Sequence, residues 1–241
     1  MTTLLQAELL KLRTTRTFIA LVAASLGLSL LVVVLAALLT KNVTKDDVHD
    51  LFTSDFSGLF ILLLGVTGMA GEWRHRTITG TVLAAPNRVK LLAAKVISYA
   101  LAGALLSLVV SIAIMVAGTI ILDARGETAI GVGDMADVLW RNLATAAYFG
   151  AIGVCVGALI RNQVTAIVGL LVLAFAIEPA LLSLAEDVAK FGPTSGAPNA
   201  VTETSFGGAH LSVGAALLVM LGWVGVLFAA GAVTLERRDL V

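Results

Sequence analysis

Six long apolar stretches, separated by shorter polar ones, set the pattern of this sequence. They run approximately over residues 18–39, 56–71, 96–122, 143–160, 164–185 and 211–235. About 20 apolar residues in a helix span a hydrocarbon core of about 30 Å, because the helix pairs its backbone polar groups internally. No connection has the length of a soluble domain. The pattern therefore predicts an all-α integral membrane protein with six transmembrane helices in one membrane domain, residues 1–241.

Two of these stretches have unusual features. Basic residues precede 18–39, as in a secretory signal, but its 22 uncharged residues are long enough to span the membrane, which indicates an uncleaved helix. The stretch 56–71 has only 16 residues. We expect it either to recruit Leu51 and Phe52 or to cross a locally thin region of the membrane.

The placement of charge adds an orientation. The chain is 59% hydrophobic and 13% charged, whereas about a quarter of a soluble domain is charged. Its 16 Lys and Arg balance its 16 Asp and Glu, so net charge does not point to nucleic acid. However, 11 of the 16 Lys and Arg lie in the N-terminus, the second and fourth connections and the C-terminus. Because positive segments stay in the cytoplasm, both termini are expected to be cytoplasmic, in a multi-pass protein of the inner (plasma) membrane.

Motifs of catalysis are missing from the sequence. It contains no G-x-x-x-x-G-K-[ST] loop for nucleotide phosphates, no H-E-x-x-H motif for zinc and no G-x-S-x-G motif. The three histidines fall in three different connections, and Cys155 is the only cysteine. We therefore expect no enzymatic activity, and no cofactor or metal bound by this chain itself.

One carboxylate falls within a predicted span. Glu178 lies 14 residues after Val164, about 21 Å along the fifth span, which places it in the outer part of the bilayer. Pro179 follows and is expected to kink or break the helix. The carboxylate could cap backbone donors freed by the break, or it could line a transport pathway, since ionisable groups inside a membrane are often functional.

Small residues repeat along the fourth span. Ala146, Gly150, Gly153 and Gly157 follow one another at steps of four, three and four, which places them on one helix face. Such faces let another backbone approach closely. The approaching backbone could belong to the same bundle or to a second copy at a dimer seam.

The N-terminus shows a short amphipathic pattern. One helical face carries leucines and the other carries polar residues: Leu5, Leu9 and Leu12 against Glu8, Lys11 and Thr15. This favours a separate helix in the inner membrane interface. The alternative is a plain extension of the first span.

The second connection, GEWRHRTITGTVLAAPNRVKLLAAK over residues 71–95, holds much of the positive charge. Topology and anionic lipid suffice to explain Trp73 and its neighbouring arginines. Residues 77–85 go further, because they predict a short helix with Ile78 and Val82 on one stripe, followed by a helix capped by Asn87. A hairpin with small apolar side chains suits a groove on a cytosolic protein.

Taken with six spans, three motifs resemble the membrane subunits of bacterial ATP-binding-cassette transporters of the type-2 permease family. LLQAELLKLRTTRTFI is similar to an E-x-x-K-x-x-x-x-R helix at the N-terminus, the 71–95 stretch is similar to the family's second connection, and LERRDL is similar to its tail. The resemblance implies two permease subunits, identical or similar, above two separate ATPases that bind ATP and Mg. It also implies export as the direction of transport, and an outer connection (186–210) that dips into the outer leaflet as short helices.

In such transporters the second connection carries the coupling helix, which fits a cleft on the ATPase. The residues that the resemblance assigns to this contact are Glu72, Arg74, Arg76, Thr77, Ile78, Val82 and Leu83. The competing interpretations are a non-transporting membrane scaffold or sensor that recruits a cytosolic partner through this loop, and a secondary carrier, which one intramembrane carboxylate supports poorly.

Overall fold

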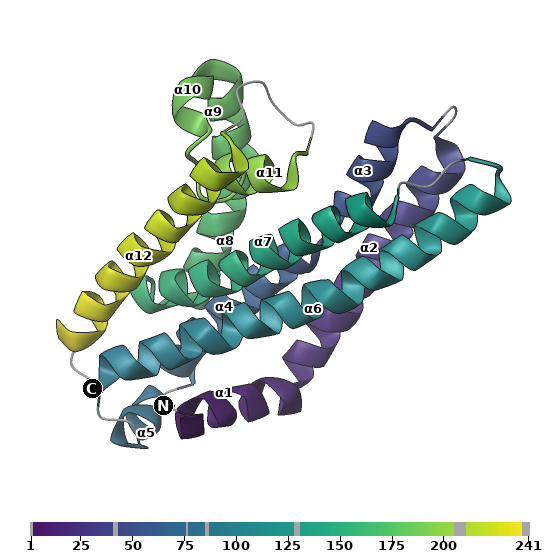
Figure 1. Cartoon of the computed structure of the whole chain (residues 1–241). Helices are drawn as coiled ribbons and strands as arrows, with labels where there is room; N and C mark the ends of the chain where they lie inside the picture. The colour runs from purple at the N-terminus through teal and green to yellow at the C-terminus, as the bar shows by residue number, and fades with distance from the viewer. Residues whose placement is uncertain are drawn as a thin grey trace.

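The computed structural model describes residues 2–40, 43–75, 77–84, 87–127, 131–204 and 211–237, and these ranges form helices without strands (Figure 1). In chain order they are α1 (Thr2–Thr14), α2 (Arg16–Leu39), α3 (Lys45–Thr53), α4 (Ser57–Arg74), α5 (Ile78–Ala84), α6 (Arg88–Ala124), α7 (Val132–Leu159), α8 (Gln163–Val172), the π-helix η1 (Leu173–Ile177), α9 (Glu178–Leu184), α10 (Glu186–Ala189), α11 (Gly196–Thr202) and α12 (Val213–Arg237).

Six helical segments of the described chain are long and apolar enough to cross a membrane, as the sequence predicts. They are Arg16–Leu39, Lys45–Arg74, Arg88–Ala124, Gly133–Leu159, Gln163–Leu184 and Val213–Arg237. The second segment includes α3 as well as α4, so Leu51 and Phe52 do extend the short apolar stretch. The protein is therefore a multi-pass, all-helical membrane protein.

The bundle is centred on α7, which lies against α4 and α6. A Cβ atom on Gly150 would lie 2.3 Å from the carbonyl oxygen of Tyr99 in α6, and one on Gly153 would lie 2.3 Å from the carbonyl oxygen of Leu62 in α4. Only glycine permits backbones to meet at these distances, because any side chain would overlap the carbonyl. The small-residue face of α7 is thus filled by contacts within the chain.

The short helices gather at the two ends of the bundle. Figure 1 shows α1 and α5 at the end where both chain termini lie, and α3, α9, α10 and α11 at the opposite end. Thr15, in an extended conformation (φ −87°, ψ 126°), separates α1 from α2. The N-terminal helix is therefore a separate element and not a plain extension of the first span.

The connection from residue 186 to 210 contains two short helices, α10 and α11, before the last span. Its residues 205–210 lie outside the described residues. Ala197, Ala200 and Val201 of α11 are buried against Ala216 and Met220 of α12, so this connection packs into the bundle.

Candidate functional site

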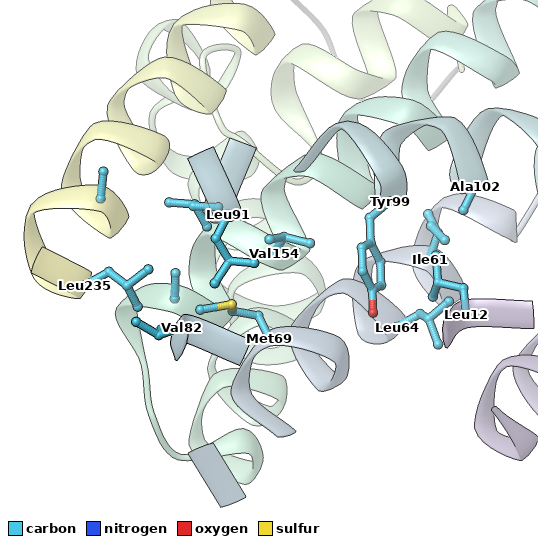
Figure 2. Close-up of a cluster of buried hydrophobic side chains, with 13 residues drawn as sticks. Leu12, Ile61, Leu64, Met69, Val82, Leu91, Tyr99, Ala102, Val154 and Leu235 are labelled. Carbon is cyan, nitrogen blue, oxygen red and sulfur yellow. The ribbon is translucent and has the colours of Figure 1, made fainter. Parts of the chain in front are cut away.

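Val82 seats the helix of the second connection, α5, on the bundle. Val82 is 8% exposed and belongs to a cluster with Met69 of α4, Leu91 of α6 and Leu235 of α12 (Figure 2). The next residue, Leu83, is 77% exposed. One face of α5 is therefore anchored in the core and another is free to contact a separate protein.

The start of α6 fixes the other end of this connection. Asn87 accepts a hydrogen bond from the backbone N–H of Lys90 at 2.9 Å, which confirms the predicted helix cap. Arg88 donates to the carbonyl oxygen of Leu235, at 2.6 Å. Carbonyls in the last turn of a helix have no partner within it and carry partial negative charge, so an arginine is well placed there. This contact ties the second connection to the end of the sixth span.

Four charged side chains from three helices meet in one network. The Nζ atom of Lys95 in α6 donates to Glu8 of α1 and to Glu72 of α4, each at 2.8 Å. Lys11 of α1 also donates to Glu72. Lys95 is fully buried, and Glu72 and Glu8 are 3% and 6% exposed. Each buried charge is thus paired, as its loss of hydration requires.

Lys11 closes this network on its exposed side. Partial burial acts to lower the pKa of Lys11, yet the hydrogen bond and charge of Glu72, together with the charge of Glu8, raise that pKa above its ordinary value. Lys11 therefore stays protonated under physiological conditions. The network joins α1, α4 and α6 at the cytoplasmic end predicted from the charge distribution.

Glu8 faces the bundle, which the amphipathic pattern of α1 did not predict. Leu12 is buried at 5%, but Leu9 is 36% exposed and Glu8 takes its place inside. The expected separation into a leucine face and a polar face is wrong at Glu8, because Lys95, which is distant in sequence, offers a buried partner.

The residues predicted to contact the ATPase divide into two groups. Glu72 and Val82 are buried, whereas Arg74, Thr77 and Leu83 are exposed. Arg74 lies 3.5 Å from the side-chain oxygen of Gln163 at the start of α8. Ile78 begins α5, and Arg76 lies outside the described residues. The outward group is the one that a separate protein can reach.

A cavity of about 380 Å³ opens beside the charged network. Its lining includes Lys11 of α1, Thr67 and Gly68 of α4, Tyr99 of α6 and Gln163 of α8. Hydroxyl, amide and charged groups line it together with apolar surface. It can hold a polar or amphipathic group between α1 and α4.

Glu178 and Pro179 lie at the opposite end of the bundle. Glu178 is 2% exposed, and its carboxylate accepts hydrogen bonds from the backbone N–H groups of Thr194, Ser195 and Gly196. Pro179 occupies the first turn of α9, directly after the π-helix. The carboxylate thus holds part of the connection before the last span.

Another carboxylate, Asp55, is held within the bundle by contacts that the sequence did not reveal. Asp55, between α3 and α4, accepts hydrogen bonds from Ser107 and Ser111 of α6 and from the backbone N–H of Ser57. The two serines lie 12 and 16 residues beyond Lys95, about 18 and 24 Å along α6. Hydropathy starts the second span just after Asp55, whereas the second membrane-spanning segment of the structure, Lys45–Arg74, includes it.

No group of His, Cys, Asp and Glu that could hold a metal ion occurs within the described ranges.

Comparison with known proteins addresses the family directly. Residues 20–240 match the model of the ABC-2 family transporter proteins, and no curated protein matches the sequence significantly. This match favours a transporter permease over a scaffold or a secondary carrier, and it implies a partner ATPase subunit. The chain therefore belongs to the ABC-2 family of transporter membrane proteins, as a permease subunit without catalytic residues of its own.

Proposed function

We propose that this chain, as a single permease domain, is one half of an exporter and that α5 is its coupling helix. The observation that carries the proposal is the contrast between two adjacent residues of α5. Val82 is 8% exposed in the core, while Leu83 is 77% exposed. A helix held this way can receive a push on its outward face and pass it to the spans, because Val82 contacts the cluster of α4, α6 and α12.

The charged network supports the same role. Glu72 lies two residues before the end of α4, immediately ahead of the loop that carries α5. Lys95 joins Glu72 to α1 and α6. Displacement of α5 would therefore move α1, α4 and α6 together, with α1 as the interfacial helix.

Orientation follows from the basic end of the molecule. The Cζ atom of Arg161 lies 4.5 Å from the ring centroid of Trp73, which groups an aromatic ring and a cation at the level where α4 ends and α8 begins. Tryptophan and arginine favour this level of a bilayer, and the positive side faces the cytoplasm. Both termini, α1 and α5 then lie on the cytoplasmic side of the inner membrane.

The pathway and the assembly complete the proposal. The 380 Å³ cavity beside α4 is the inner end of the pathway for an exported amphipathic substrate. Two copies, or this chain and a similar permease, enclose the pathway, since one bundle of this size packs its own centre with α7. Two ATPase subunits bind below and supply the ATP and Mg chemistry.

The test replaces Leu83 by Asp. The permease is co-expressed with a Walker-motif ATPase encoded beside its gene, and we measure co-purification and permease-stimulated ATP hydrolysis. We expect Leu83→Asp to fold with an unchanged melting temperature but to lose both. Leu184→Asp is the matched control, because Leu184 is 84% exposed at the opposite end of the bundle. Retention of the ATPase and of full stimulation by Leu83→Asp would show that α5 is not the coupling helix.

A further inference from the structure

The outer half of the fifth span is attached to the rest of the protein in an unusual way. From Leu173 to Leu184, which the structure describes throughout, Glu178 is the one buried residue. The apolar side chains around it point outward; Phe175 is 66% exposed and Leu181 is 39% exposed. A carboxylate, rather than apolar packing, therefore docks this half of the span.

The carboxylate is held by a tight turn of the outer segment, here defined as residues 186–204. The backbone N–H of Thr194 donates to both carboxylate oxygens, to Oε1 at 2.9 Å and to Oε2 at 3.1 Å. Oε2 also accepts from the backbone N–H of Ser195 and, at 3.3 Å, from that of Gly196. Bonds from N–H groups to an ionised carboxylate are among the stronger hydrogen bonds in proteins. Three consecutive donors fix the carboxylate in place.

The turn also supplies a hydrogen-bond donor to the backbone at the break in the fifth span. In η1 the backbone N–H of Glu178 donates to Leu173, five residues back. In the same pattern the carbonyl oxygen of Ala174 would accept from the backbone N–H of residue 179. That residue is Pro179, which has no N–H. The hydroxyl of Ser195 donates to the Ala174 carbonyl at 3.2 Å instead. The turn thus satisfies a carbonyl that the proline leaves unpaired in a setting without water.

Two glycines of the outer segment allow the close contacts of this turn. A Cβ atom on Gly192 would lie 2.6 Å from the Oε2 atom of Glu178, and one on Gly196 would lie 2.1 Å from the Ala189 carbonyl oxygen. Elsewhere the outer segment is tied to other spans: Tyr148 of α7 donates to Pro193 and Trp223 of α12 donates to Phe191, each at 2.8 Å. The segment therefore bridges α7 and α12 to the broken fifth span.

We infer that Glu178 is a positioning residue that latches the outer half of the fifth span to the outer segment, so that movement of this span opens the outer end of the permease. The latch itself does not depend on the proposed function; only the coupling of its opening to ATP hydrolysis rests on it.

The experiment measures the accessibility of one cysteine. Cys155, the only native cysteine, is replaced by Ala, and Thr194, which is 7% exposed, is replaced by Cys. This near-isosteric change leaves the Thr194 N–H in place. Labelling by a membrane-impermeant maleimide is then followed in vesicles, with and without Glu178→Gln. Asp187→Asn is the matched control, because that carboxylate lies in the same segment with its side chain 93% exposed.

We expect Glu178→Gln to accelerate labelling about tenfold or more, because losing hydrogen bonds to a charged acceptor shifts a local opening equilibrium by roughly that factor. Asp187→Asn should label like the parent. Ser195→Ala, which removes only the donor to Ala174, should accelerate labelling by a smaller factor and serves if Glu178→Gln does not fold. Labelling of both variants within twofold of the parent rate would overturn the latch.

The same parent cysteine, in complex with the ATPase, tests the coupling. A merely structural Glu178 would leave labelling independent of nucleotide, whereas the latch predicts faster labelling during ATP turnover. A complex that hydrolyses ATP with unchanged labelling would overturn the coupling and leave the proposed function intact. Failure to recruit an ATPase would count against the proposed function, while the labelling without nucleotide still decides the latch.

Discussion

The Nζ atom of Lys95 lies 2.8 Å from the Oε2 atom of Glu8, although 87 positions separate the two residues in the sequence. The same ammonium group contacts Glu72, so one buried cation is paired with carboxylates from two other helices. A cation shared by two carboxylates is sensitive to removal of any single partner, because the remaining charges stay buried without compensation.

Replacing Lys95 by Met should therefore destabilise the permease strongly. We expect a loss of about 3–5 kcal/mol in the free energy of unfolding, the usual cost of breaking a buried ion pair from one side. The melting temperature of the purified protein checks this. Lys90→Met is the control, because Lys90 is exposed at the start of the same helix.

Neutralising the three buried members of the network should restore much of that loss. In Lys95→Met with Glu8→Gln and Glu72→Gln the one charge left in the network is that of Lys11, whose side chain is 51% exposed and keeps contact with water. The melting temperature of this triple variant should therefore exceed that of Lys95→Met alone. A triple variant less stable than Lys95→Met would mean that the three side chains contribute by their shape or by other contacts, and not as paired charges.

Truncation of the two neighbouring residues of α5 should weaken its docking at Val82 and leave it unchanged at Leu83. Val82→Ala removes buried apolar surface and should weaken the docking of α5 by about 1–2 kcal/mol. Leu83→Ala should leave docking unchanged, since Leu83 is 77% exposed. Hydrogen exchange of the α5 amides measures this difference; Val82→Ala should accelerate exchange by roughly a factor of ten. Equal exchange in the two variants would contradict the seating of α5.

The sequence predicted local features well and partnerships between distant residues poorly. Hydropathy located six spans, and local patterns gave the α5 helix and the Asn87 cap. Burial of Glu8 could not be predicted from α1 alone, because its cause is Lys95 in another span. Asp55 was missed for a similar reason, since its donors Ser107 and Ser111 are uncharged residues within an apolar stretch.

The glycines of α7 provide a test of packing within the chain. Gly150→Ala should destabilise the protein by about 1–3 kcal/mol, the range for overpacking, because its Cβ atom would lie 2.3 Å from the Tyr99 carbonyl oxygen. Gly169→Ala is the matched control. Apart from the adjoining backbone of the same helix, no atom lies within 4 Å of a Cβ there, so this change should be neutral or stabilise the helix by about 0.5–1 kcal/mol.

A loss of stability in Gly150→Ala that appears equally in dilute monomeric and in concentrated dimeric preparations would agree with contacts inside one chain. A loss that appears only as weaker dimerisation would instead place this face at a seam between two copies. Melting curves at several protein concentrations, paired with sedimentation, separate the two results.

Asp55 should stabilise the junction of α3 and α4 through its serine partners. The Ser107 and Ser111 hydroxyls of α6 both donate to Oδ2, whereas the Ser57 N–H donates to Oδ1. Asp55→Asn keeps the shape but replaces one acceptor oxygen by a donor, so either the two serine bonds or the Ser57 bond must be lost. We expect a loss of about 1–3 kcal/mol, the cost of leaving buried polar groups unpaired. Asp46→Asn is the control, because Asp46 is an exposed residue in the first turn of α3.

A double-mutant cycle assigns this effect to the proposed contacts. If Asp55 acts through the serines, Ser107→Ala and Asp55→Asn should be less than additive, with a coupling energy of about 0.5–3 kcal/mol in unfolding experiments. The pairing of Ser107→Ala with Asp46→Asn should be additive. Additivity at Asp55 as well would mean that its carboxylate stabilises the protein through the Ser57 backbone, to which it also bonds at 2.7 Å, and not by joining α4 to α6.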